Sequence, residues 1–107
     1  MTVAYNTASG LAGAMAIDSG VSGTFTRVTI VNNTDLFAAL TGGGAITLKN
    51  SVIAYNHATD GYNPISCQSS FLSGGNNWQY PLTRAGGGQD SLCATNAKTT
   101  DPQSMCK

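Results

Sequence analysis

Three short segments of this chain share one pattern: an aliphatic residue, two further residues, then asparagine followed by a small polar side chain or an imidazole. The segments are 3–7, 30–34 and 53–57, and their shared asparagines are Asn6, Asn33 and Asn56, which lie 27 and 23 residues apart. Recurrence at roughly 20–50 residues is typical of proteins that stack one structural unit repeatedly. The pattern therefore predicts successive turns of backbone lying one above another, with like side chains in columns.

The segments around these asparagines indicate strands. Two β-branched runs, 24–30 and 47–53, each follow a segment of glycine, small residues and isoleucine, at 13–17 and 43–46. Such runs, separated by Gly, Asn and Asp, are typical of strands joined by tight turns. Placing Ile30 over Ile53 puts Phe25 over Leu48, so we expect these four side chains to form a stacked core. Parallel stacking in a β-helix is favoured, and a flat sandwich is the alternative.

The composition points to β-structure before any pattern is considered. Only 9% of the residues are charged and none is glutamate, whereas the chain has 13 Thr, 10 Ser and 9 Asn. An average globular protein has about 25% charged residues. Because strong helix formers are scarce, we expect an all-β fold. A length of 107 residues predicts one domain, with regular coils over 1–59 and irregular coils or a cap over 60–107.

Asparagine at the repeated turn has a physical explanation. Its amide both donates and accepts hydrogen bonds, and it tolerates left-handed backbone better than most residues. Stacked at the ~4.8 Å spacing of neighbouring strands, such side chains can bond along a column. We therefore predict an asparagine ladder of Asn6, Asn33 and Asn56. Three unrelated turn asparagines are the alternative.

Over 42–102 the order of features resembles extracellular bacterial right-handed parallel β-helix proteins. These are large surface proteins with polymorphic-outer-membrane-type repeats, often anchored at their C-terminus, and the likeness is to their last coils. It is carried by Gly43–Ile46, Leu48–Asn56, Cys67, Ser73–Asn77, Cys93 and Asp101–Pro102, with 1–41 matching as looser coils. Those proteins run for several hundred residues and continue past the Asp-Pro pair. We interpret this chain as a piece of a longer protein or a minimal solenoid that protects its own ends.

The resemblance implies a right-handed parallel β-helix of about four short coils with a disulfide-pinned C-terminal part. It also implies a disulfide between Cys67 and Cys93, and hence an oxidising compartment, extracellular or at the cell surface. Cys106 would then be free or form an intermolecular bond. A bridge between Cys93 and Cys106 is the competing pairing, and three reduced thiols are the alternative to both.

Several classes of function find no support in the sequence. The five basic residues are dispersed and the net charge is zero, which argues against nucleic acid as a partner. No apolar run approaches the ~20 residues of a membrane span, so membrane insertion is not expected. His57 is the only histidine, and Asp60 is the only other ligand type near it. We expect no metal and no cofactor.

The predicted function is non-catalytic, because the five aspartates form no local pair of the kind that polysaccharide hydrolysis needs. We expect an extracellular module for surface display, adhesion or self-assembly into fibres, with the chain itself, stacked end to end, or surface glycans as partners. The alternative is binding of ice or a neutral glycan through a flat face rich in Thr and Asn. A remnant of a polysaccharide-degrading β-helix is favoured less. The residues of the alternative are Thr24, Thr26, Thr29 and Thr47 on strands and the aromatic side chains Tyr62, Trp78 and Tyr80.

Overall fold

The fold is built from short β-strands joined by turns and longer loops. The computed structural model describes residues 1–8, 13–18, 20–36, 38–42 and 45–101. These residues contain eleven strands and no helix, which confirms the all-β expectation. The strands are β1 (Thr2–Ala4), β2 (Met15–Ile17), β3 (Gly23–Thr26), β4 (Thr29–Val31), β5 (Thr34–Asp35), β6 (Leu40–Gly42), β7 (Ile46–Lys49), β8 (Val52–Ala54), β9 (His57–Ala58), β10 (Leu72–Gly75) and β11 (Trp78–Tyr80).

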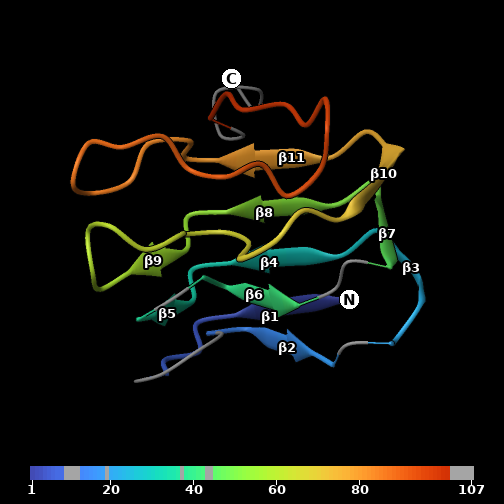
Figure 1. Cartoon of the computed structure of the whole chain (residues 1–107), viewed down its shortest axis with the longest axis horizontal. Coiled ribbons are helices and arrows are strands. Elements are labelled where there is room, and N and C mark those ends of the chain that lie inside the picture. The colour runs from blue at the N-terminus through green and yellow to red at the C-terminus, as the bar shows by residue number, and fades with distance from the viewer. Residues whose placement is uncertain (9–12, 19, 37, 43–44, 102–107) are drawn as a thin grey trace.

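The strands form parallel sheets whose members are distant in sequence. The largest sheet has the order β1-β4-β8-β11, the second has the order β10-β7-β3, and β2-β6 and β5-β9 are two-stranded. Every pair of named strands is parallel. Figure 1 shows the largest sheet rising from β1 near one end of the molecule to β11 near the other. Each strand thus pairs with the strand about one repeat further along the chain.

The register of the parallel pairs matches the alignment of the repeats. Ile30 lies opposite Ile53 in β4 and β8, and Phe25 lies opposite Leu48 in β3 and β7. Ile30, Leu48 and Ile53 are at most 1% exposed, whereas Phe25 is half-buried and packs against them. Parallel in-register pairing puts equivalent side chains on one face. The core is therefore a set of apolar columns that run across the strands.

Left-handed residues divide the chain into layers. Arg27, Asn50, Asn76 and Asn96 have φ values of 56°, 50°, 58° and 61°, and they lie 23, 26 and 20 residues apart. Positive φ is uncommon for residues other than glycine, so its recurrence at this spacing marks an equivalent corner. We call residues 1–27 the first layer, 28–50 the second, 51–76 the third and 77–96 the fourth. Residues 97–101 follow, and Lys98 forms a parallel bridge with Trp78 of β11.

The glycine segments before the two β runs are not equivalent in the structure. Ile17 of the first segment lies opposite Gly42, and Ile46 of the second lies opposite Gly23. A Cβ at Gly42 would meet the carbonyl oxygen of Ile17 at 2.0 Å, and Gly42 has a φ of +81°. Glycine is therefore required at position 42. Because Ile17 and Ile46 pair with different strands, the likeness of the two segments does not report a shared place in a repeat.

The segment from residue 60 onward combines strands with long loops. It was expected to be irregular, and it contributes β10 to the second sheet and β11 to the largest sheet. Residues 59–71 and 81–101 connect or follow these strands as turns and loops. Among the described residues, the sole antiparallel pairing is an isolated bridge between Thr83 and Gln89. In Figure 1 the loops after β11 run beside it and then beyond it, at the opposite end of the molecule from β1.

Candidate functional site

The three repeated asparagines lie in one hydrogen-bonded column. The backbone N and Nδ2 of Asn33 both donate to Asn56 Oδ1, each at 3.0 Å. The same two groups of Asn6 donate to Asn33 Oδ1, again at 3.0 Å. Asn33 Nδ2 also donates to the carbonyl of Val3, and Asn56 Nδ2 donates to that of Ile30. Asn33 and Asn56 are buried, so the column satisfies polar groups inside the molecule and ties three layers together.

A left-handed residue precedes each member of the asparagine column. Tyr5, Asn32 and Tyr55 have φ values of 59°, 56° and 58°. This conformation turns the chain so that the following backbone N–H of the first two layers points at the amide oxygen of the next layer. The repeated position thus consists of a left-handed residue followed by asparagine. Tyrosine adopts that conformation at a cost, which the hydrogen-bonded column offsets.

A second polar column occupies the other end of the largest sheet. The backbone N of Val28 donates to Ser51 Oγ, and the backbone N of Ser51 donates to Asn77 Oδ1, both at 3.2 Å. Asn77 Nδ2 donates to the carbonyl of Leu48 at 2.8 Å. The residue pattern does not predict this column, because its three positions hold valine, serine and asparagine. Each of the three positions follows a left-handed residue (Arg27, Asn50 or Asn76), but arginine and asparagine also occur in other conformations, so residue type alone does not identify these corners.

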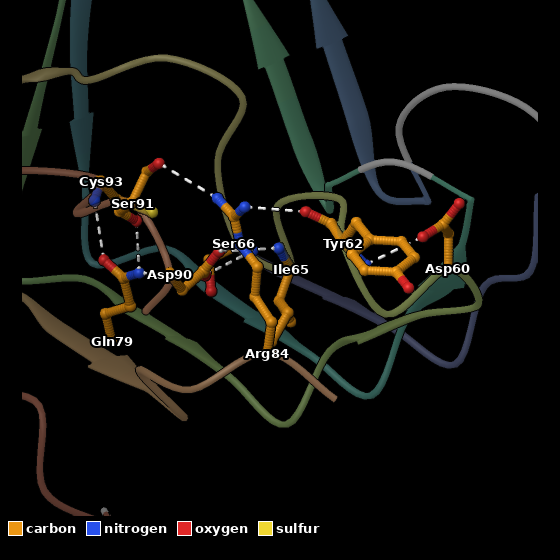
Figure 2. A network of polar contacts seen from close by, with 9 residues as sticks. All are labelled: Asp60, Tyr62, Ile65, Ser66, Gln79, Arg84, Asp90, Ser91 and Cys93. Carbon is orange, nitrogen blue, oxygen red and sulfur yellow. Dashed lines mark hydrogen bonds and ion pairs between the residues drawn. The ribbon is translucent and has the colours of Figure 1, made fainter. Parts of the chain in front are cut away.

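A buried ion pair closes the far end of the fold. Asp90 Oδ1 and Arg84 Nε are 3.1 Å apart, and the exposed fractions of the two side chains are 0% and 21%. Asp90 also accepts hydrogen bonds from the backbone N–H groups of Ile65 (3.0 Å) and Ser66 (3.3 Å). Figure 2 shows the guanidinium of Arg84 reaching between this carboxylate and the carbonyl of Tyr62, to which Nη1 donates at 2.7 Å. The pair therefore holds the third-layer loop against the last loops.

Gln79 extends this network into the core. It lies opposite Ile53, so an amide follows the isoleucines in their column, and it is 1% exposed. Its Oε1 accepts from the backbone N of Cys93 at 2.7 Å, and its Nε2 donates to the carbonyl of Ser91 at 2.8 Å. Figure 2 shows these bonds beside Asp90. The apolar column therefore ends in a side chain whose polar atoms are all used by the loop above it.

The disulfide implied by the family resemblance is present. Cys67 and Cys93 are joined, with their Cα atoms 5.3 Å apart. Cys67 lies opposite Leu40, which in turn lies opposite Met15, so the disulfide continues an apolar column. Cys106, the predicted leftover thiol, lies outside the described residues.

A small pocket lies at the end of the asparagine column. Its volume is about 180 Å³, and its lining includes Asn56, His57, Asp60, Ile65 and Pro81. Sites for drug-sized ligands usually measure about 300–1,000 Å³, so this pocket suits one small group. His57 is exposed on its rim. Among the described residues, no group of three or more His, Cys, Asp or Glu could hold a metal ion.

The predicted aromatic residues occupy different settings. Trp78 Nε1 donates to the carbonyl of Thr100 at 2.5 Å, and Lys98 Nζ lies 5.1 Å from the indole centroid. Tyr80 makes an edge contact with Tyr55, with ring centroids 5.8 Å apart. Tyr62 is 82% exposed in a loop and its backbone N donates to Asp60 Oδ1. Of the three, Tyr62 is the side chain most open to solvent.

The predicted threonines form no long regular array. Thr24 lies opposite Thr47, but Thr26 lies opposite Lys49. The partner of Thr47 on its other side is Leu72. A Thr column therefore spans two layers on this face. The described residues include no helix of the length and apolarity that crossing a membrane demands.

Known proteins supply no relative from which a role could be transferred. No family model, no curated protein and no solved structure matches this chain. The resemblance to bacterial surface β-helix proteins therefore stays a prediction.

Proposed function

We propose that this chain is a right-handed β-solenoid module that acts outside the cell without catalysis, in surface display, adhesion or self-assembly. The carrying observation is the shared register of three successive layers, in which β1, β4 and β8 pair in parallel. A connection between neighbouring parallel strands is right-handed in about 98% of cases, which supports the handedness. The equivalent left-handed corners at Arg27, Asn50 and Asn76 support one turn of chain per layer.

The disulfide supports a location in an oxidising compartment. Cytosolic proteins of mesophiles rarely keep structural disulfides, whereas secreted and surface proteins use them widely. Cys67 and Cys93 are buried and join consecutive layers, so their bond serves the structure. The very low proportion of charged residues, with solubility supplied by hydroxyl and amide side chains, fits a stacked extracellular scaffold.

The way the chain uses its polar side chains supports a structural role. The buried carboxylate of Asp90 accepts from two backbone N–H groups and pairs with Arg84, and the amide of Gln79 fixes the backbone at Cys93. The asparagine column likewise bonds to backbone and to itself. The strongest polar clusters of the fold therefore stabilise loops.

Engineered disulfides test the solenoid. Thr29 and Val52 lie directly opposite each other, so Thr29→Cys with Val52→Cys, in a Cys106→Ser background, should oxidise within one chain. Thr29→Cys with Lys49→Cys is the control, because these two positions are out of register. Mass spectrometry after mild oxidation should find the first bond and not the second. Equal bonding in both variants would overturn the stacked arrangement.

Two assays test the proposed role. Beads that carry the protein should retain cells, surface polysaccharide or further copies of the protein. This retention should be lost when the Cys67–Cys93 disulfide is reduced. Acidic and neutral polysaccharides incubated with the protein should keep their chain length. Release of new reducing ends or unsaturated sugars would refute the non-catalytic proposal.

Binding of a neutral glycan is the second candidate, favoured by one observation. Tyr62 presents an exposed ring beside Asp60, which lines the small pocket. An aromatic ring can stack on the apolar face of a sugar while nearby polar groups receive its hydroxyls. Tyr62→Ala should abolish retention on a glycan array, and Tyr5→Ala, at an equally exposed ring in the first layer, should leave it unchanged. Equal retention by both variants would remove this candidate.

A further inference from the structure

The first layer leaves its apolar side chains partly uncovered. The partly buried side chains packed against the core are Val3, Ala14, Met15, Ile17 and Phe25, all from the first layer. Their column partners in the second layer are covered: Ile30 and Leu40 are 0% exposed and Leu48 is 1% exposed. Met1 and Tyr5 of the same layer are 64% and 79% exposed. The end of the molecule at β1 therefore presents a continuation of the core to solvent.

The strands at this end carry none of the usual protection of a sheet edge. Their sequences, Thr-Val-Ala in β1, Met-Ala-Ile in β2 and Gly-Thr-Phe-Thr in β3, contain no charged residue and no proline. Natural edge strands commonly carry Lys or Pro, which prevents another strand from adding. The register of β1 against β4 turns the backbone groups of Val3 inward and those of Thr2 and Ala4 outward. Among the described residues, no donor reaches Asn6 Oδ1, although the equivalent oxygens of Asn33 and Asn56 each accept two bonds.

The opposite end is closed. Gln79 ends the isoleucine column, the disulfide ends another, and Lys98 lies against the last strand of the largest sheet. In Figure 1 the loops after β11 run beside it, and the last described part of the chain passes beyond it, where Lys98 bridges Trp78. A second copy that placed its first layer here would meet Gln79, the disulfide and Lys98 in place of an apolar column and a free edge of the largest sheet, so head-to-tail stacking is disfavoured. Two first layers can meet, because an edge strand pairs with its own copy in antiparallel orientation.

We propose that the first layer is a dimerisation surface on which a second copy of this chain adds its β1 antiparallel to β1. The two half-buried apolar ends cover each other, and the outward backbone groups of Thr2 and Ala4 bond across the two-fold axis. The contact is isologous and closes at two copies. This inference rests on the self-assembly role proposed above and limits that assembly to a dimer.

Sedimentation and light scattering on the Cys106→Ser protein test the inference, because no thiol then links chains. The mass should rise from one copy to two over about a hundredfold range of concentration and go no higher. Ala4→Pro removes an outward donor while leaving the inward bonds of Val3, and it should raise the dissociation constant about tenfold or more. Tyr5→Lys, which puts a charge at the same end, should do the same. Leu92→Lys, at an exposed apolar residue of the last loops, is the matched control and should dimerise normally.

Cross-linking locates the contact. The double variant Thr2→Cys with Ala4→Cys, in the Cys106→Ser background, should form disulfide-linked dimers on oxidation, because each cysteine then faces the other position of the second copy. Leu92→Cys, in the same background, should not. A monomer at every concentration, oligomers that keep growing, or preferential linkage through residue 92 would each overturn the inference. The intrachain disulfide between positions 29 and 52 is measured separately, so a failed dimer leaves the solenoid proposal standing or falling on its own result.

Discussion

The two ends of this molecule finish the same apolar columns in different ways. At the first layer, Val3 and Phe25 are only partly buried and the edge strands are uncharged. At the fourth layer, Gln79 replaces isoleucine, and a buried ion pair and a disulfide hold loops across the end. The last strands of a stacked β-fold must be covered, because otherwise their unpaired backbone groups and apolar side chains would face water. The comparison shows that the fourth layer is covered by loops that hydrogen bonds, an ion pair and a disulfide hold in place, whereas the first layer has no such cover among the described residues.

Removing the carboxylate of Asp90 should have the largest effect. Asp90→Ala leaves the guanidinium of Arg84 without a balancing negative charge and two backbone N–H groups without an acceptor, so the free energy of unfolding should fall by about 3–5 kcal/mol. Urea denaturation followed by tryptophan fluorescence measures it through Trp78. Asp18→Ala, an exposed aspartate of the open end, should change stability by less than about 0.5 kcal/mol. Similar losses from both variants would erase the contrast between the ends.

Truncating one apolar column at two depths should give unequal losses. Ile53→Ala creates a cavity in a fully buried site and should cost about 2–5 kcal/mol. Val3→Ala removes a half-exposed side chain from the same column and should cost about 1 kcal/mol. Calorimetric or chemical unfolding of both variants decides the matter. A loss at Val3 as large as that at Ile53 would mean that the first layer is already covered in solution, as it would be in a tight dimer.

Breaking the disulfide should loosen the closed end. Cys67→Ser with Cys93→Ser opens a loop of 26 residues and should reduce stability by about 3 kcal/mol. Hydrogen exchange should then rise first at Gln79 and the loop above it. Cys106→Ser is the control and should leave stability unchanged. Faster exchange confined to the first layer would contradict the assigned role of the bond.

The asparagine column should show the smallest of these contrasts. Asn33→Ala removes the acceptor of the backbone N of Asn6, the donor to the carbonyl of Val3 and one of the two donors to the buried Asn56 Oδ1, and should cost about 2 kcal/mol. Asn6→Ala, at the exposed end of the column, should cost less than about 1 kcal/mol. Thermal unfolding of the two variants tests this order, and the reverse order would show that the column is anchored at the open end.

The sequence was informative where a repeat kept its residue type. Asn6, Asn33 and Asn56 recur after an aliphatic strand, and their amides accept from one layer while donating to another. The same alignment predicted the register of Ile30 on Ile53. The column through Ser51 and Asn77 was invisible because several short polar groups can accept one backbone N–H. Arg84 and Asp90 pair across a glycine-rich loop, and Asp90 also accepts from the backbone N of Ile65. The sequence pattern does not indicate that Ile65 lies near this loop, so the network could not be predicted.

The recurrent left-handed corners have a consequence for how such a chain can change length. Arg27 and Asn50 have the same backbone conformation at equivalent places, so excising 28–50 would splice one corner onto the other without a bend in the path. β1 would then meet β8, and Phe25 would approach the face now covered by Leu48. On the solenoid arrangement proposed above, the number of layers would change by whole periods through deletion or duplication, and the loops after β11 would be kept unchanged.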